Sequence, residues 1–161
     1  MKEKTKENII AYVVGIAMPL SVGLLSAFLT KDNMSLYTEI NTPPLSPPSW
    51  LFPVVWTILY ALMGVSSALV FTNAANNPVE AKRGLLTYFV SLAVNFFWSI
   101  LFFNLRLFRL SFFWLLLLLG LIIKTVIHYK RVSSLAAYLQ IPYIAWVAFA
   151  GYLNLAIAIL N

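Results

Sequence analysis

The 161-residue sequence contains no cysteine, a single histidine and only five carboxylate side chains. The absence of cysteine excludes a disulfide framework, thiolate metal sites, iron–sulfur clusters and cysteine nucleophiles. Only 10% of the residues are charged and 61% are hydrophobic, whereas an ordinary globular domain is about 25% charged. A soluble globular domain is excluded because so few charges could not cover its surface. Intrinsic disorder is excluded because the chain is far too apolar.

The charges stand in short clusters that are separated by long uncharged stretches. A transmembrane helix needs about 20 predominantly apolar residues to cross about 30 Å of hydrocarbon. We therefore predict an all-α integral membrane protein with a single domain over residues 1–161. Its five transmembrane helices form a bundle with a long first extramembrane loop. The helices are expected at approximately 9–29, 50–72, 85–104, 110–129 and 135–159.

Lys and Arg are distributed unequally between the two sides of this predicted bundle. Eight lie on the side of the N-terminus and three on the opposite side, and basic residues favour the cytoplasmic side. The N-terminus is therefore expected in the cytoplasm, with the C-terminus and the first loop outside. The basic excess is explained by topology, and no basic patch with interleaved aromatics supports nucleic-acid binding.

The first loop, roughly residues 30–49, is the one long connection. It contains Pro43, Pro44, Pro47 and Pro48, and each proline fixes its φ near −65°. The run predicts an extended, stiff segment, which would act as a lid or as a spacer over the bundle. Loops of this length tend to be functional.

Conventional catalytic chemistry has little support in the sequence. All five carboxylates lie outside the predicted spans, which argues against an ion-coupled transporter, because such proteins usually carry ionisable residues within the membrane. His128 lies two residues before Lys130 and is expected to be a solvated, interfacial side chain. A hydrolytic triad and a metal site are both unsupported.

Uncharged polar, aromatic and small residues recur at every fourth position of three predicted helices and so share faces. These stripes are Trp56, Tyr60 and Gly64; Ser91, Asn95 and Ser99, with Trp98 adjacent; and Tyr138, Pro142, Trp146, Ala150 and Asn154. Such residues either hold helices together or line a flat aromatic slot for a small molecule. The pattern alone leaves both interpretations open. Gly15, Gly23, Gly64 and Ala68 are expected sites of close helix approach.

Three segments resemble the translocator protein family (TspO/MBR, formerly the peripheral-type benzodiazepine receptors). They are residues 43–60 (PPLSPPSWLFPVVWTILY), 95–103 (NFFWSILFF) and 137–150 (AYLQIPYIAWVAFA). The length and the five-helix plan also fit, so the resemblance covers nearly the whole chain. One departure is Leu45, which stands where the family often has tryptophan.

The resemblance implies a homodimeric five-helix bundle with an aromatic pocket under the first loop. Ligands of that pocket would be porphyrins, such as protoporphyrin IX and haem, or other flat aromatic molecules, and no further cofactor would be required. Transferred by motif position, the ligand-binding residues would be Tyr37, Pro47, Trp56, Tyr60, Asn95, Trp98, Trp146 and Ala150.

The resemblance also implies a bacterial-type inner-membrane protein that binds tetrapyrroles and takes part in tetrapyrrole regulation or a stress response. One alternative is a transporter of tetrapyrroles or sterols. Another is an enzyme that degrades bound porphyrin with light and oxygen, in which Trp56 and Trp146 would be the photochemical residues. The sequence does not separate these three functions.

Overall fold

The computed structural model describes residues 2–161, with side chains from Thr5 onward. No strand occurs in this range, and five helical segments are long and apolar enough to cross a membrane. The predicted all-α membrane fold is confirmed. The helices are α1 (Lys2–Thr30), α2 (Leu36–Glu39), α3 (Leu51–Thr72), α4 (Pro78–Ser99), α5 (Phe108–Lys130), α6 (Ser134–Leu139) and α7 (Ile141–Leu160).

Helix α4 begins seven residues before the predicted span. The Asn77 side chain accepts a hydrogen bond from the backbone N–H of Glu80 and caps the helix, and Pro78 follows in its first turn. Both are common at helix starts, because the first N–H groups have no partner within the helix. The uncharged stretch marked only the part of α4 that suits hydrocarbon, and the helix continues beyond it.

The fifth predicted span is two helices, α6 and α7, that meet at Gln140. Pro142 lies in the first turn of α7, where its missing N–H costs no hydrogen bond. The Gln140 side chain is buried at the junction, and its Nε2 donates to Ser66 Oγ of α3 over 3.2 Å. Ser66 in turn donates to the carbonyl of Ala136 over 2.7 Å. These two hydrogen bonds hold the junction of α6 and α7 against α3.

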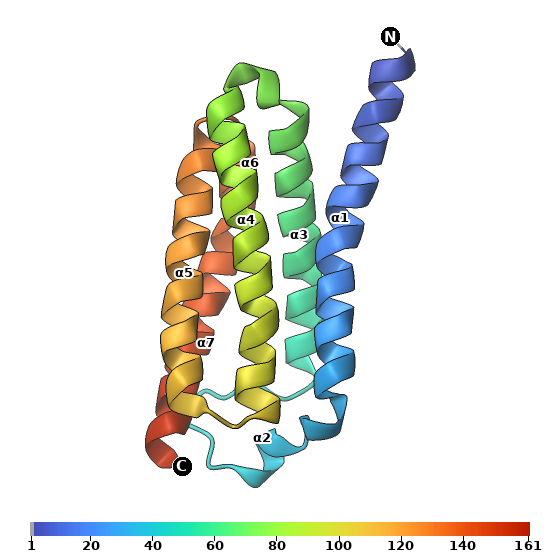
Figure 1. The fold of residues 1–161 in the computed structure, drawn as a ribbon. Helices are drawn as coiled ribbons and strands as arrows, with labels where there is room; N and C mark the ends of the chain where they lie inside the picture. The colour runs from blue at the N-terminus through green and yellow to red at the C-terminus, as the bar shows by residue number, and fades with distance from the viewer. Residues whose placement is uncertain (1) are drawn as a thin grey trace.

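The five long helices run side by side in alternating directions (Figure 1). Helix α1 packs mainly on α3, α4 packs on α5, and α5 also packs on α7. The N-terminal part of α1 diverges from the other helices, and α2 lies across the end of the bundle that carries the C-terminus. The two termini therefore lie at opposite ends.

Two glycines allow α1 and α3 to approach closely. A Cβ atom on Gly64 would lie 2.5 Å from the carbonyl oxygen of Gly15, and a Cβ atom on Gly15 would lie 3.2 Å from Cβ of Ala68. The small residues that were expected at close approaches therefore pack within one chain.

Residues 31–50, which we call the loop-1 lid, are less extended than the prolines predicted. The segment contains a single turn of 3₁₀ helix and α2. A further turn follows at Pro44 and Leu45, where the Ser46 N–H donates to the Pro43 carbonyl over 3.3 Å and Leu45 has a φ of +69°. Proline fixes only its own φ, so Leu45, which with Ser46 separates the two proline pairs, is free to turn the chain.

The lid is fastened to two parts of the bundle. Tyr152 of α7 donates from its hydroxyl to the Pro44 carbonyl over 2.9 Å, and Asn161 exchanges hydrogen bonds with the backbone of Asn41 over 3.0 and 3.1 Å. Arg106, in the α4–α5 connection, pairs with Glu39 over 3.0 Å. The proline-rich segment is therefore a lid over one end of the bundle.

Candidate functional site

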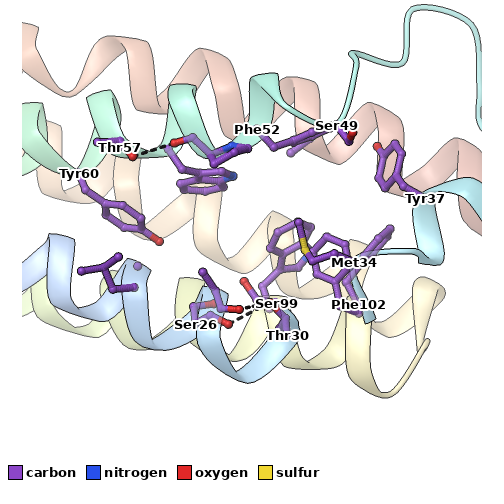
Figure 2. Close-up of a pocket in the computed structure, with 18 of the residues that line it drawn as sticks. Ser26, Thr30, Met34, Tyr37, Ser49, Phe52, Thr57, Tyr60, Ser99 and Phe102 are labelled. Carbon is purple, nitrogen blue, oxygen red and sulfur yellow. Dashed lines mark hydrogen bonds between the residues drawn. The ribbon is translucent and has the colours of Figure 1, made fainter. Parts of the chain in front are cut away.

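A cavity of about 440 Å³ lies beneath the loop-1 lid. Its walls come from α1, the lid, α3, the end of α4 and α7, and Figure 2 shows their side chains converging on one space. Small-molecule sites in proteins usually have volumes of about 300–1,000 Å³ and mostly apolar walls. The cavity therefore has the size and the lining of a ligand site.

The aromatic wall comes from one stripe of α3. Phe52, Trp56 and Tyr60 are spaced by four residues and all line the cavity. The ring centroids of Trp56 and Tyr60 are 5.5 Å apart. In the described part of the chain, the indole N–H of Trp56 has no hydrogen-bond partner. This N–H is available to a ligand.

The opposite wall comes from α1, which the sequence did not indicate. Gly23 leaves room for the ring of Tyr60, because a Cβ atom at this position would overlap that ring. Ser26 and Thr30 are buried and also line the cavity, and Thr30 Oγ1 donates to the Ser26 carbonyl over 2.9 Å. Two hydroxyl residues at i and i+4 in an apolar span were the signal that could have identified this wall.

Trp98 of α4 contributes its ring to the cavity and uses its N–H elsewhere. Its Nε1 donates to Asn154 Oδ1 of α7 over 3.1 Å, and Asn154 Nδ2 donates to the Phe108 carbonyl over 2.7 Å. The ring stacks on Phe102 at 5.5 Å between centroids. Phe102 belongs to a π-helical turn, Ile100–Asn104, that extends α4. Ala150 of α7 completes this side of the cavity.

Asn95 acts on the cavity through Tyr60. It is buried on α4 and does not line the cavity, and its Nδ2 donates to the Tyr60 hydroxyl over 2.9 Å. The predicted stripe on α4 is real, but the amide supports the cavity wall from behind.

Trp146 and Pro47 are the other predicted site residues that lie outside the cavity lining. Trp146 faces an apolar groove between α3 and α7 and contacts Phe52 with ring centroids 5.9 Å apart. Its Nε1 is buried, with no hydrogen-bond partner among the described residues. The structure thus brings together Tyr37, Trp56, Tyr60, Trp98 and Ala150. Trp146 lies outside this group and contacts the cavity-lining Phe52.

The cavity contains no charged lining residue within the described part of the chain. Tyr37 is the lid's aromatic contribution, and burial raises the pKa of its phenol to about 12. It is therefore a neutral hydrogen-bonding group at physiological pH. Lys31 lies beside the cavity-lining Thr30, with its Nζ 4.5 Å from the centroid of the Phe28 ring. Leu45 is 81% exposed and forms no part of the wall.

The expectation for His128 is wrong. Its side chain is only 13% exposed, and its Nδ1 lies 2.9 Å from Oε2 of Glu80. Glu80 lies in the first turn of α4 and is buried, although the sequence placed every carboxylate outside the spans. The expectation of a solvated histidine failed because α4 extends beyond its uncharged stretch and brings Glu80 against the end of α5.

Comparison with known proteins decides the family. The model of the TspO/MBR family matches residues 15–160. The chain belongs to the TspO/MBR family. It is 36% identical over 157 residues to the tryptophan-rich protein TspO of Chlorobaculum tepidum, an alignment that covers 96% of this chain and 98% of that protein.

Similarity extends across kingdoms. The translocator protein of Ovis aries is 35% identical over 88% of this chain and 85% of its own length. Protein CrtK of Rhodobacter capsulatus is 37% identical over 78% of each chain. The family assignment made from the three motifs is confirmed, and this TspO/MBR-family chain is a membrane protein of five spans.

Proposed function

We propose that this TspO/MBR-family chain binds tetrapyrroles, such as protoporphyrin IX or haem, in the cavity beneath the loop-1 lid. The observation that supports this most directly is the uncharged cavity of about 440 Å³, with Trp56, Tyr60 and Trp98 in its walls. A flat macrocycle would be held between aromatic rings, which favour offset or edge contacts at about 4.5–7 Å. Binding would serve tetrapyrrole regulation or a stress response.

The carboxylate edge of such a ligand would face the lid. Tetrapyrroles carry two propionates, and the three basic residues at this end of the bundle are Lys31, Arg106 and Arg109. Arg106 is already paired with Glu39, whereas Lys31 and Arg109 have no ion pair among the described residues. Lys31 and Arg109 are therefore the proposed propionate partners.

A titration of the purified protein with protoporphyrin IX, followed by porphyrin absorbance, tests the proposal. Trp56→Phe removes the indole N–H of a side chain that lines the cavity and should weaken binding, while thermal melts show the bundle still folded. Trp146→Phe should have a smaller effect, because Trp146 does not line the cavity and contacts Phe52, which does. If both variants bind like the wild type and only their melting temperatures move, the cavity is not the porphyrin site.

Light-dependent degradation of bound porphyrin is a second candidate, and the position of Trp56 favours it. An excited porphyrin in the cavity would lie against an indole whose N–H is unpaired, with oxygen as the external oxidant. Illumination of the same complexes, with and without oxygen, separates binding from degradation. Oxygen-dependent bleaching that is lost in Trp56→Phe and does not occur with free porphyrin would support the photochemical function.

For the membrane placement, we propose a bacterial inner membrane with the N-terminus in the cytoplasm and the lid outside. Cysteine at Asn77 should be labelled only from the cytoplasm and cysteine at Asp32 only from outside. The reverse pattern would contradict this orientation. A homodimer is proposed from the family, and a detergent-corrected mass of one 18.1 kDa chain at micromolar concentration would contradict it.

A further inference from the structure

At the end of the bundle opposite the cavity, a buried carboxylate holds two arginines in place. Glu80 of α4 has a side chain that is only 8% exposed. Its Oε1 accepts from Arg83 Nη1 over 3.2 Å, and its Oε2 accepts from Arg131 Nη1 over 2.9 Å. His128 Nδ1 lies 2.9 Å from the same Oε2. Arg131 comes from the α5–α6 connection, so the carboxylate joins α4 to that connection.

Most of the hydrogen-bonding capacity of the two arginines is unused. A guanidinium carries five N–H donors, and each arginine donates one hydrogen bond to Glu80. No other hydrogen bond of either guanidinium is found among the described residues. Their side chains are 63% and 58% exposed. The carboxylate thus neutralises only one of two positive charges and leaves two outward-facing, partly fixed guanidiniums.

Among the side chains that the structure describes, the surroundings add positive charge and no further carboxylate. Lys82 and Lys130 lie beside the two arginines in the sequence and are exposed. Asp32 and Glu39 lie at the opposite end of the bundle. Glu7 belongs to α1, whose N-terminal part diverges from the other helices (Figure 1). The cluster of Glu80, Arg83, His128 and Arg131, which we call the arginine pair site, is therefore locally cationic.

The position of the arginine pair site places it where a bilayer meets water. It lies at the start of one membrane-spanning helix and the end of another, because α4 begins at Pro78 and α5 ends at Lys130. Three large apolar side chains near it in the sequence are exposed. These are Val79, Ile127 and Leu135.

We propose that the arginine pair site binds the phosphate of an anionic phospholipid headgroup. Arginine matches phosphate oxygens with paired N–H donors, and basic pockets between transmembrane helices bind anionic lipid headgroups. A free phosphate offers the same oxygens. The lipid is favoured because the exposed Val79, Ile127 and Leu135 can contact its acyl chains. A free phosphate has no apolar part that could make these contacts.

Glu80 would be a positioning residue in this site. It fixes both guanidiniums before the lipid arrives, which lowers the conformational entropy lost on binding. A purely structural role, in which the cluster only joins α4 to the end of α5, would give a loss of stability without any dependence on lipid headgroup. Headgroup preference is therefore the decisive observable.

The test is a lipid titration of the full chain in detergent, followed by native mass spectrometry of bound lipid. Phosphatidylglycerol and phosphatidylcholine of the same acyl chains are compared, with inorganic phosphate as a competitor. We expect the wild type to prefer phosphatidylglycerol. Arg83→Gln and Arg131→Gln should each lower phosphatidylglycerol affinity about fivefold, and together about 25-fold, with phosphatidylcholine unaffected.

The matched control is the pair Arg106→Gln and Arg109→Gln, which removes the same charge from the opposite end of the bundle. It should retain the preference for phosphatidylglycerol. The proposal is overturned if the double variant at the arginine pair site keeps its preference, or if the control loses it equally. Full competition by millimolar inorganic phosphate would instead indicate a free-anion site and overturn the lipid assignment.

The double variant leaves Glu80 buried with only His128 beside it, and an uncompensated buried charge is strongly destabilising. A triple variant, Glu80→Gln with Arg83→Gln and Arg131→Gln, removes the carboxylate together with its partners. Circular dichroism and elution volume establish folding for each variant. Loss of headgroup preference in a folded triple variant supports the site, and a retained preference overturns it.

Discussion

Asn95 Nδ2 donates a hydrogen bond to the hydroxyl of Tyr60 over 2.9 Å, and this bond joins α4 to the aromatic wall on α3. Tyr60 lines the cavity and Asn95 does not. The amide therefore fixes the orientation of a phenol that faces the ligand space. An effect of Asn95 on ligand affinity should pass through Tyr60.

The first prediction is that Asn95 and Tyr60 are coupled. Asn95→Ala and Tyr60→Phe should each weaken porphyrin binding about 2- to 10-fold, since a neutral hydrogen bond contributes about 0.5–1.5 kcal/mol. The double variant should bind no more weakly than the weaker single one, as residues in one hydrogen-bond network are not additive. A porphyrin absorbance titration of the four proteins measures this. Additive losses would show that Asn95 contacts the ligand directly.

The difference between Asn95 and Trp56 shows what the sequence could predict about the site. Spacing by four identified the correct faces, because helix geometry alone decides which residues share a face. It could not say whether a face lines the cavity or supports the lining residues. That depends on how the helices are rotated and how closely they approach, and these follow from contacts such as Gly23 against the Tyr60 ring.

The fold was more predictable than the site, and the errors have physical causes. Uncharged stretches located all five spans, because hydrocarbon excludes charge from each one. They did not locate helix ends such as the start of α4, since a helix can extend past the hydrocarbon on capped, charged turns. They also missed the break at Gln140, because Pro142 in an apolar run leaves hydropathy unchanged.

The second prediction contrasts two glycines. Gly64→Ala should destabilise the bundle by about 1–3 kcal/mol, because the new methyl group would lie 2.5 Å from the Gly15 carbonyl oxygen and overpacking has that cost. Gly151→Ala in α7 meets nothing within 4 Å. It should be neutral or stabilise by up to about 1 kcal/mol through helix propensity. Unfolding titrations in mixed detergent micelles measure both. Equal effects would show that α1 and α3 are farther apart than described.

The third prediction concerns the fastening of the loop-1 lid. Tyr152→Phe removes the hydrogen bond to the Pro44 carbonyl and should speed porphyrin release about 2- to 10-fold. Arg106→Gln should have a smaller effect. Both members of the Arg106–Glu39 pair are about half exposed, and such pairs contribute about 0–1 kcal/mol. Stopped-flow displacement gives the release rates.

Thr87→Val is the matched control for the lid. Thr87 Oγ1 donates to the Arg83 carbonyl over 2.8 Å, on α4 and away from the lid. Loss of this hydrogen bond should leave the rate of porphyrin release unchanged. Raising the salt concentration should leave the difference between Tyr152→Phe and the wild type unchanged, because the hydrogen bond from Tyr152 is not an ion pair. Unchanged release in Tyr152→Phe would mean that ligand leaves by another route.

The fourth prediction compares two buried tyrosines that differ in their hydrogen bonding. The Tyr143 hydroxyl is buried in α7 and has no partner among the described residues, whereas the Tyr129 hydroxyl of α5 lies 2.9 Å from Ser67 Oγ. An unpaired buried hydroxyl is unfavourable, so Tyr143→Phe should leave the free energy of unfolding unchanged or raise it. Tyr129→Phe should lower it by about 0.6 kcal/mol, the average for hydrogen bonds within membrane proteins.

Neither change alters ring packing, so the comparison isolates the hydroxyl group. Ser67 also donates to the Met63 carbonyl over 2.9 Å, so it keeps one partner when Tyr129 is changed, and the loss at Tyr129 should be small. The free energies of unfolding of the two variants, measured in one detergent mixture, test this prediction. A larger loss for Tyr143→Phe than for Tyr129→Phe would mean that the Tyr143 hydroxyl holds a buried water. Such a water would place a polar contact beside Trp56, whose ring centroid is 6.2 Å from that of Tyr143.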